Sequence, residues 1–346
     1  MVTAAVVLAV VGVCLSQSID IRDEAKTLRD ISRVVYDLPA VLQDRGPFPA
    51  AFMVFATPSD VRSPVESLDR YRILREKGVP LNGFFLETEH TALNTDSSRH
   101  FVALAEAYGF RVLIRVPSLS VDSVKSWNSL GHSGLIVPLV DSFSTIDAAF
   151  KANFYSQGRP IGFEVDTRFL TAGSKQDLAL VDSRRILAVM IESFTAAENI
   201  HALVDYAAAR ALKASIDPKR IAFWLGPYDM TNDVRLSNPS WSDEQINKYV
   251  SDKTTEITQA VVAAGLTMGG HVPSSESAMD RIQQGWKIFT FDGMFSENLF
   301  SDQTVLQRFG PKSPIASLRR RRSYLPKEKE RLSKLAQELT DMLQEQ

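Results

Sequence analysis

Three ionisable residues follow directly after a run of apolar residues in the segment GFFLETEH. Glu87, Glu89 and His90 stand at the end of a stretch that is typical of a buried strand. Side chains at the carboxyl end of a strand are held in place by the strand itself. A histidine beside two acids can act as a general base, because the acids orient its ring and raise its basicity. A purely structural histidine is the alternative interpretation.

Polar side chains end several further apolar runs. They are Arg115, Glu192, Ser193, Asp229, His271 and Asp292. If these runs are parallel strands of one closed barrel, their carboxyl ends meet at a single mouth. Carboxylates on adjacent strands repel one another, so we expect Mg²⁺ or Mn²⁺ between Glu192 and Asp229, with water and substrate as further ligands. Helix capping, or pairing with a lysine, is the alternative role for any single acid.

Arg115 ends the apolar run RVLIRVP. Its guanidinium stays charged and offers a planar set of donors. Such a group suits a carboxylate, or an oxygen that becomes negative in a transition state. A salt bridge to Glu87 or Glu89 is the structural alternative.

The chain alternates between apolar runs and helical patterns from Pro49 onward. The runs predict strands at 50–56, 83–90, 111–117, 134–140, 186–193, 220–229, 265–273 and 286–293. Helices are expected between them, at 65–77, 97–108, 122–130, 145–154, 196–212, 243–264 and 275–284, with a long loop over 155–175. Continuous apolar runs are typical of parallel strands buried on both faces. The repeats predict an α/β TIM (β/α)8 barrel with helical extensions at both ends. A doubly wound open sheet is the rival, but no GxGxxG motif follows the first strand.

Four regions follow from this organisation. We expect residues 1–18 to form a signal-like or buried apolar segment, 19–47 an N-terminal helical extension, 48–300 the barrel, and 301–346 a basic linker with an amphipathic helix. If residues 1–16 are a signal peptide, the chain enters the secretory pathway. The apolar run is too short to span a bilayer comfortably, so a membrane protein is not expected.

Composition narrows the possible partners. The 346 residues carry a formal net charge of -2, which offers no basic field for nucleic acid. The single cysteine, Cys14, allows neither a disulfide within the chain nor a cysteine-rich zinc site. A small substrate remains the expected partner.

Five motifs occur in the order in which one enzyme family has them. They are LETEH, RVLIRVP, GLIVPLVDS, VMIES and GPYDMTNDV, within residues 50–300. Together they resemble the HpcH/HpaI aldolase/citrate lyase family of metal-dependent pyruvate aldolases. The resemblance implies a barrel enzyme that cleaves or forms a 2-oxo acid through a pyruvate enolate. It also implies a cytoplasmic homo-oligomer. An oxaloacetate-type decarboxylase of the same family is the alternative activity.

The same resemblance assigns roles to residues. Glu192 and Asp229 would bind the divalent metal, Mg²⁺ or Mn²⁺. The acid/base residue would be His90, acting with Glu87, and Arg115 would stabilise the enolate oxygen. The residues assigned to substrate binding are Ser193, Gly226 and Pro227.

Three positions depart from the family pattern. Glu87 stands where aspartate is usual, Met190 replaces a glutamine before the metal-binding glutamate, and Ser129 replaces an aspartate lent to a neighbouring subunit. We therefore expect a reshaped aldehyde end of the pocket. A non-catalytic barrel that acts as a binding or scaffold protein is the second hypothesis.

Overall fold

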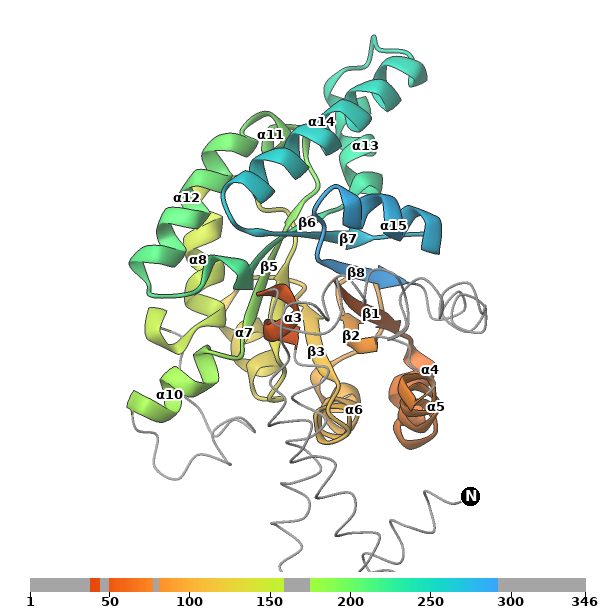
Figure 1. The fold of residues 1–346 in the computed structure, drawn as a ribbon, viewed down its shortest axis with the longest axis vertical. Helices are drawn as coiled ribbons and strands as arrows, with labels where there is room; N and C mark the ends of the chain where they lie inside the picture. Colours follow the sequence, from red (N-terminus) through yellow and green to blue (C-terminus); the bar gives the residue numbers. More distant parts are fainter. Residues whose placement is uncertain (1–37, 44–49, 77–80, 159–174, 292–346) are drawn as a thin grey trace, which may run out of the picture.

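Eight parallel strands close into a barrel in the order in which they occur along the chain (Figure 1). The computed structural model describes residues 38–43, 50–76, 81–158 and 175–291. The strands are β1 (Ala51–Ala56), β2 (Leu81–Glu87), β3 (Arg111–Arg115), β4 (Gly134–Val137), β5 (Ile186–Ile191), β6 (Ile221–Leu225), β7 (Thr267–His271) and β8 (Ile288–Phe291). Because β1 also pairs with β8, the sheet has no edge and the predicted TIM barrel is confirmed.

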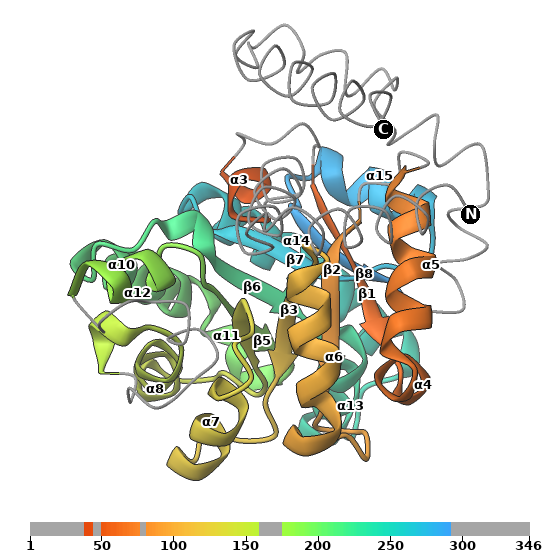
Figure 2. The same ribbon diagram turned by 90° about the horizontal axis from the view of Figure 1, so that it is seen from below.

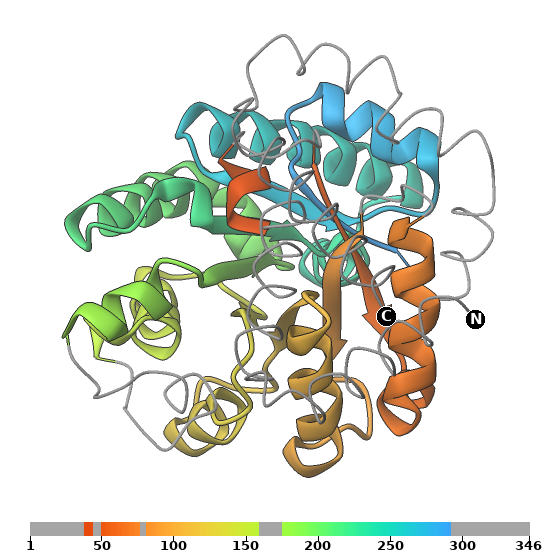
Figure 3. The ribbon, with the colours of Figure 1, turned by 60° about the horizontal axis from the view of Figure 1, so that its bottom comes forward.

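Helices surround the strands, as the two turned views show (Figures 2 and 3). They are α3 (Leu38–Leu42), α4 (Pro58–Arg62), α5 (Pro64–Glu76), α6 (Thr95–Ala107), α7 (Val121–Asn128), α8 (Phe143–Asn153), α10 (Lys175–Asp182), α11 (Phe194–Glu198), α12 (Ile200–Lys213), α13 (Pro227–Ser237), α14 (Asp243–Ala263) and α15 (Ser275–Gln283). Two 3-10 helices, η1 (Tyr155–Gln157) and η2 (Pro218–Arg220), complete the described elements.

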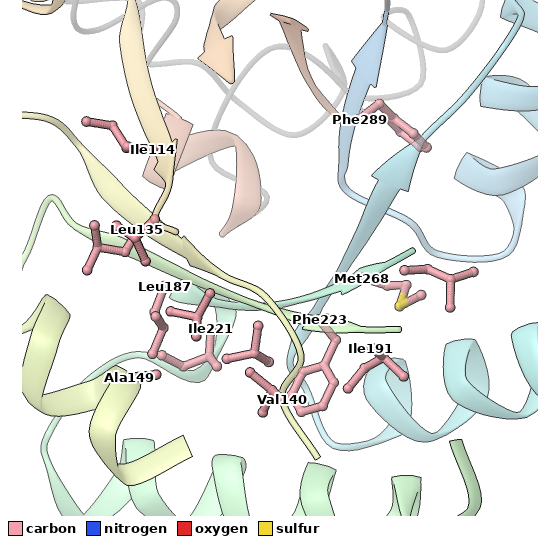
Figure 4. Close-up of a cluster of buried hydrophobic side chains, with 14 of the residues drawn as sticks. Ile114, Leu135, Val140, Ala149, Leu187, Ile191, Ile221, Phe223, Met268 and Phe289 are labelled. Carbon is pink, nitrogen blue, oxygen red and sulfur yellow. The ribbon is translucent and has the colours of Figure 1, made fainter. Parts of the chain in front are cut away.

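Alternate residues of each strand face the barrel interior and the surrounding helices. Along β5, Ala188 and Met190 belong to the interior cluster, whereas Leu187 and Ile191 pack against the helices (Figure 4). Both faces of the strand are apolar, which explains the continuous apolar run in the sequence. Successive residues of a strand point alternately to the interior and to the helices, so only every second residue can direct its side chain to the site at the mouth.

The short helix α3 closes the amino-terminal end of the barrel. Leu38, Val41 and Leu42 are buried in the same cluster as Ala51 and Ile288, which begin β1 and β8. An apolar plug at this end leaves the carboxyl ends of the strands as the open side of the barrel.

The structure corrects several expected boundaries. The sixth strand ends at Leu225, so Asp229 lies in the first turn of helix α13 and not on a strand. Helices α4, α10 and α13 were not predicted, and the expected helix at 196–212 is divided into α11 and α12. The missed α13 follows from Gly226 and Pro227, which were assigned to the strand, although proline at a first helical position favours a helix start.

Some predictions fall on residues that the structure does not describe. These are the apolar segment 1–18, most of the extension 19–47, residues 159–174 of the expected loop, Asp292 and the C-terminal region 301–346. Within the described residues, no helix combines the length and the apolar character that a membrane crossing requires.

Candidate active site

The Arg115 guanidinium lies among three carboxylates at the carboxyl ends of β2, β3 and β5. Its Nη1 donates to Glu87 at 3.2 Å, and its Nη2 donates to Glu192 at 3.1 Å. Its Nε lies 2.5 Å from Glu89 Oε2, an ionic contact without hydrogen-bond geometry. The Arg115 side chain is only 9% exposed, so these ion pairs are shielded from water. The salt bridges considered as the alternative role of Arg115 are therefore present.

Strand register explains this convergence. Glu87 on β2 is the register partner of Arg115 on β3, so their side chains point to the same face. Glu192 follows Met190 by two residues, which directs it to the barrel interior as well. The structure thus brings together the carboxylates that the sequence placed at separate strand ends.

Glu87 also organises the turn that carries His90. Its Oε1 accepts hydrogen bonds from the backbone N–H groups of Glu89 at 2.7 Å and His90 at 3.2 Å. The His90 side chain is 63% exposed, and its Nε2 lies 3.6 Å from Glu89 Oε2. His90 therefore stands at the rim of the mouth, in contact with solvent and next to an acid.

Glu192 is the most buried acid of the group, with a side chain that is 1% exposed. Burial raises its pKa, and the negative charges of Asp229 and Glu89 raise it further. The charge of Arg115 and the hydrogen bond from the N–H of Leu139 lower the pKa, but they do not cancel the increase. That N–H donates to Glu192 Oε2 at 3.0 Å. Leu139 has a φ of 51°, in the left-handed region that a side chain other than that of glycine rarely adopts. No sequence signal marked Leu139, because glycine or asparagine is usual at such a position.

Gly226 makes room for Glu192. A Cβ at Gly226 would lie 2.6 Å from Glu192 Cγ and 2.8 Å from its Oε1. The Gly226 N–H donates to the Ile191 carbonyl at 3.1 Å, which continues the pairing of β5 with β6. Pro227 then begins α13. The Gly-Pro pair therefore shapes the space around Glu192 and starts the helix that carries Asp229.

Asp229 is exposed, and its charge raises the pKa of Glu192. Within the described residues Asp229 makes no hydrogen bond or ion pair, unlike the other three acids. Nor do three His, Cys, Asp or Glu side chains come together there to hold a metal by themselves. Mg²⁺ and Mn²⁺ are commonly bound by one or two carboxylates completed by water and substrate. Two mutually repelling carboxylates, one of them unpaired, fit such an ion.

Three further positions have structural surroundings of their own. The Ser193 hydroxyl accepts the N–H of Ala196 at 3.1 Å and caps α11, so its role in substrate binding stays a prediction. Met190 lies in the barrel interior beneath Glu192 and is 4% exposed. Ser129 donates to the Ser126 carbonyl at 2.7 Å at the end of α7. Met190 thus contributes to an apolar floor, which also contains Phe85 and Trp224.

The fold and the acidic mouth define a closed parallel (β/α)8 barrel with an ionisable cluster at its carboxyl end. No family model matches the sequence, and no curated protein sequence matches it.

Solved structures with the same fold include members of the HpcH/HpaI aldolase/citrate lyase family, which confirms the predicted resemblance at the level of fold. The HpcH/HpaI aldolase from Desulfitobacterium hafniense DCB-2 is 20% identical, with a TM-score of 0.56, covering 77% of this chain and 93% of that one. A family protein from Burkholderia cenocepacia J2315 is 17% identical, with a TM-score of 0.57, covering 79% and 99%. The citrate synthase SbnG is 17% identical, with a TM-score of 0.56, covering 79% and 98%.

Proposed function

We propose that this protein is a metal-dependent carbon–carbon lyase that cleaves or forms a 2-oxo acid through a pyruvate-like enolate. The observation that carries the proposal is the charge imbalance at the barrel mouth. Glu87, Glu89 and Glu192 pair with one permanent cation, Arg115, and Asp229 acts electrostatically on Glu192 without a cation of its own among the described residues. Four acids near one arginine favour a further cation at this place.

Glu192 and Asp229 would hold that cation. A bound Mg²⁺ or Mn²⁺ supplies Lewis-acid stabilisation of the negative charge that develops on the oxygens of a 2-oxo acid. Gly226 contributes by leaving space over the β6 end, where a larger residue would displace the Glu192 carboxylate. The apolar floor beneath Glu192 keeps bulk water away from the buried side of the substrate.

Arg115 has two tasks in this proposal. Its bond to Glu192 opposes the effect of burial on the pKa of that acid, and so favours the ionised form that binds a cation. It also places a fixed positive charge beside the developing enolate oxygen.

His90 is the proposed proton carrier. It stands at the exposed rim, and Glu87 holds its backbone while Glu89 lies 3.6 Å from its ring. In the cleavage direction His90 accepts the proton of the substrate hydroxyl as the carbon–carbon bond breaks. Its exposure lets it exchange that proton with solvent. The oxaloacetate-type decarboxylase uses the same cation and arginine, but without removal of a hydroxyl proton.

The fold neighbours agree with this proposal. Their names describe HpcH/HpaI aldolases and a citrate synthase, which make or break carbon–carbon bonds beside a carbonyl group. At 17–20% identity they support the barrel, and the charged cluster of this chain supports the chemistry.

Mn²⁺ binding and proton exchange test the proposal together. We expect Mn²⁺ to bind by calorimetry and to allow exchange of the pyruvate methyl protons in deuterium oxide, followed by NMR. Pyruvate release from 4-hydroxy-2-oxo acids, or from oxaloacetate, distinguishes aldolase from decarboxylase.

Glu192→Gln, which preserves shape but removes the charge, should lower the exchange rate by at least roughly 100-fold. Thr255→Ala, at an exposed position of the outer helix α14, serves as a control with unchanged rates. A wild-type protein that neither binds Mn²⁺ nor exchanges protons would favour the scaffold hypothesis. A fully active Glu192→Gln variant would refute the assignment of the metal ligand.

A further inference from the structure

The wall formed by β7 and β8 carries polar residues that the proposed chemistry does not use. His271 ends β7, and Thr290 is its register partner on β8. Thr290 lies two residues after Ile288 and therefore on the same face of β8, which points to the interior cluster. Phe289 and Phe291 lie on the other face and pack outward. Both His271 and Thr290 therefore face the inside of the barrel.

Thr290 is fully buried, yet its hydroxyl has no hydrogen-bond partner within the described residues. Buried polar side chains nearly always have such a partner, in the protein or in a bound molecule. A hydroxyl of this kind at the inner wall is a ready donor or acceptor for a ligand.

Phe55 adds an apolar surface to the same wall. Its ring centroid lies 5.7 Å from that of His271 and 4.6 Å from that of Phe85. Phe55 is half-buried, at the end of β1, which pairs with β8. One part of this wall is thus polar, and the adjoining part is aromatic.

The wall borders directly on the proposed cation site. Leu225 at the end of β6 pairs with Gly270 of β7. The residues that follow them, Gly226 and His271, are therefore neighbours. The side chain of Glu192 lies over Gly226. Two spacings of about 4.8 Å separate β5 from β7, which puts the Glu192 and His271 backbones roughly 10 Å apart. The β7–β8 wall therefore lies beside the Glu192 carboxylate, within the span of one small molecule.

We propose that His271, Thr290 and Phe55 bind the second reactant, an uncharged aldehyde with an aromatic or apolar chain. This inference rests on the proposed function. The carbon–carbon bond forms between the enolate carbon of the 2-oxo acid and the aldehyde carbon. The methyl proton leaves to the site's base, and the aldehyde oxygen gains a proton as the hydroxyl forms. His271 and Thr290 hydrogen-bond to the aldehyde oxygen, and the aldehyde chain packs on Phe55.

Charge selects against an anionic aldehyde. Of the inward-facing residues at the strand ends that the structure describes, Arg115 alone is a permanent cation, and three carboxylates already surround it. A second carboxylate on the aldehyde would meet the repulsion of Glu87, Glu89 and Glu192. The wall at Phe55 offers apolar contact to the chain of a neutral aldehyde.

A matched pair of aldehydes tests the inference. With pyruvate and Mn²⁺, we expect addition to benzaldehyde to have a kcat/KM at least tenfold above that for 4-carboxybenzaldehyde.

The variant His271→Leu should lower the ratio of the aldol addition rate to the pyruvate proton exchange rate at least tenfold, mainly through a higher KM for the aldehyde. His271→Gln, which can still hydrogen-bond, should recover part of the ratio. Thr290→Val, similar in shape, should lower it by a smaller factor.

The readouts separate two kinds of failure. If the wild-type protein exchanges the pyruvate protons but His271→Leu keeps the wild-type ratio, or if the anionic aldehyde is preferred, the subsite is overturned and the proposed function stands. If the wild-type protein shows no proton exchange, both are overturned. Thr255→Ala, at an exposed position of the outer helix α14, controls for mutation in general and should keep the wild-type ratio. Circular dichroism of each variant checks that the barrel is folded.

Discussion

Leu139 shows how one backbone conformation can position a buried acid. Its N–H holds Glu192, while its side chain is 60% exposed and has no role in the contact. The left-handed conformation costs a residue with a Cβ roughly 1–2 kcal/mol. The structure therefore keeps a strained residue where the carboxylate needs a donor, as often occurs at functional sites.

Glycine at this position relieves the strain. We expect Leu139→Gly to raise the free energy of unfolding by about 0.5–1 kcal/mol, less than the full strain because glycine loses more entropy on folding. Mn²⁺ affinity should be retained, because the N–H stays in place. Leu139→Ile, with a branched Cβ, should leave the left-handed region and weaken Mn²⁺ binding about tenfold, the cost of roughly one hydrogen bond to a charged group. Urea unfolding and calorimetry measure both effects, and equal Mn²⁺ losses in the two variants would contradict this account.

Gly226 is required for a different reason, namely space. Gly226→Ala puts a methyl group 2.6 Å from Glu192 Cγ, so we expect the carboxylate to move and activity to fall by at least about 100-fold. Gly158→Ala is the matched control. Gly158 has a φ of 103° with nothing within 4 Å of an added Cβ, so the control should cost about 1 kcal/mol of stability with activity kept. Comparable losses of activity in both variants would show that the effect is not local.

At the scale of elements, helix contacts connect the two proposed metal ligands. Glu192 precedes α11, and Asp229 lies in α13. The N–H of Phe194 at the start of α11 donates to Asp233 of α13 at 2.7 Å. This bond ties the turn after β5, which carries Glu192, to the helix after β6, which carries Asp229.

A second contact joins α11 to α14 and makes stability depend on pH. Hydrogen bonds from Tyr249 at 2.6 Å and Lys253 at 3.0 Å lower the pKa of Glu198. The folded state therefore prefers the ionised acid. This contribution is fully present above the unfolded pKa of about 4.3, and is lost as pH falls through the lower folded pKa.

The variant Glu198→Gln should show the pH range over which Glu198 contributes to the free energy of unfolding. Because Glu198 is 46% exposed, we expect a loss on the order of 0.5 kcal/mol at pH 7, after screening by solvent. The difference from wild type should shrink as the pH is lowered below 4. Urea unfolding at several pH values checks this, and Tyr249→Phe should show a smaller version of the same trend. A difference that does not change with pH would argue for lost packing instead.

At the scale of the whole molecule, binding of the proposed cation should stabilise the folded barrel. At a free Mn²⁺ concentration 100 times the Kd, the folded state should gain about 2.7 kcal/mol. For a domain of this size that gain raises the Tm by several degrees, at roughly 2–4 °C per kcal/mol. Glu192→Gln should show little of this shift, and EDTA should reverse it in the wild type. An equal shift in both proteins would place the ion elsewhere.

The homo-oligomer implied by the family resemblance stays a prediction, which light scattering can test.

The amino-acid sequence by itself determined the order and type of most elements. Apolar runs of strand length, separated by amphipathic helices, specify parallel strands, because each strand must be apolar on both faces to lie between a barrel interior and a helical layer. The same patterns located Glu87, Arg115 and Glu192 at strand ends. Helix α13 was missed because the apolar run of β6 continues into Gly226 and Pro227 without a polar break, which hides the helix start that Pro227 favours.

Tertiary structure decided how these residues meet. Closure of the barrel and its register bring Glu87 and Glu89 from the end of β2 and Glu192 from the end of β5 around Arg115 of β3. Their spacing along the chain does not encode this proximity. It also decided that the N–H of Leu139 holds Glu192, since this contact depends on the path of the backbone after β4. The physical reason is that local patterns report which face of an element is buried, whereas contacts between side chains depend on where the closed sheet places each strand.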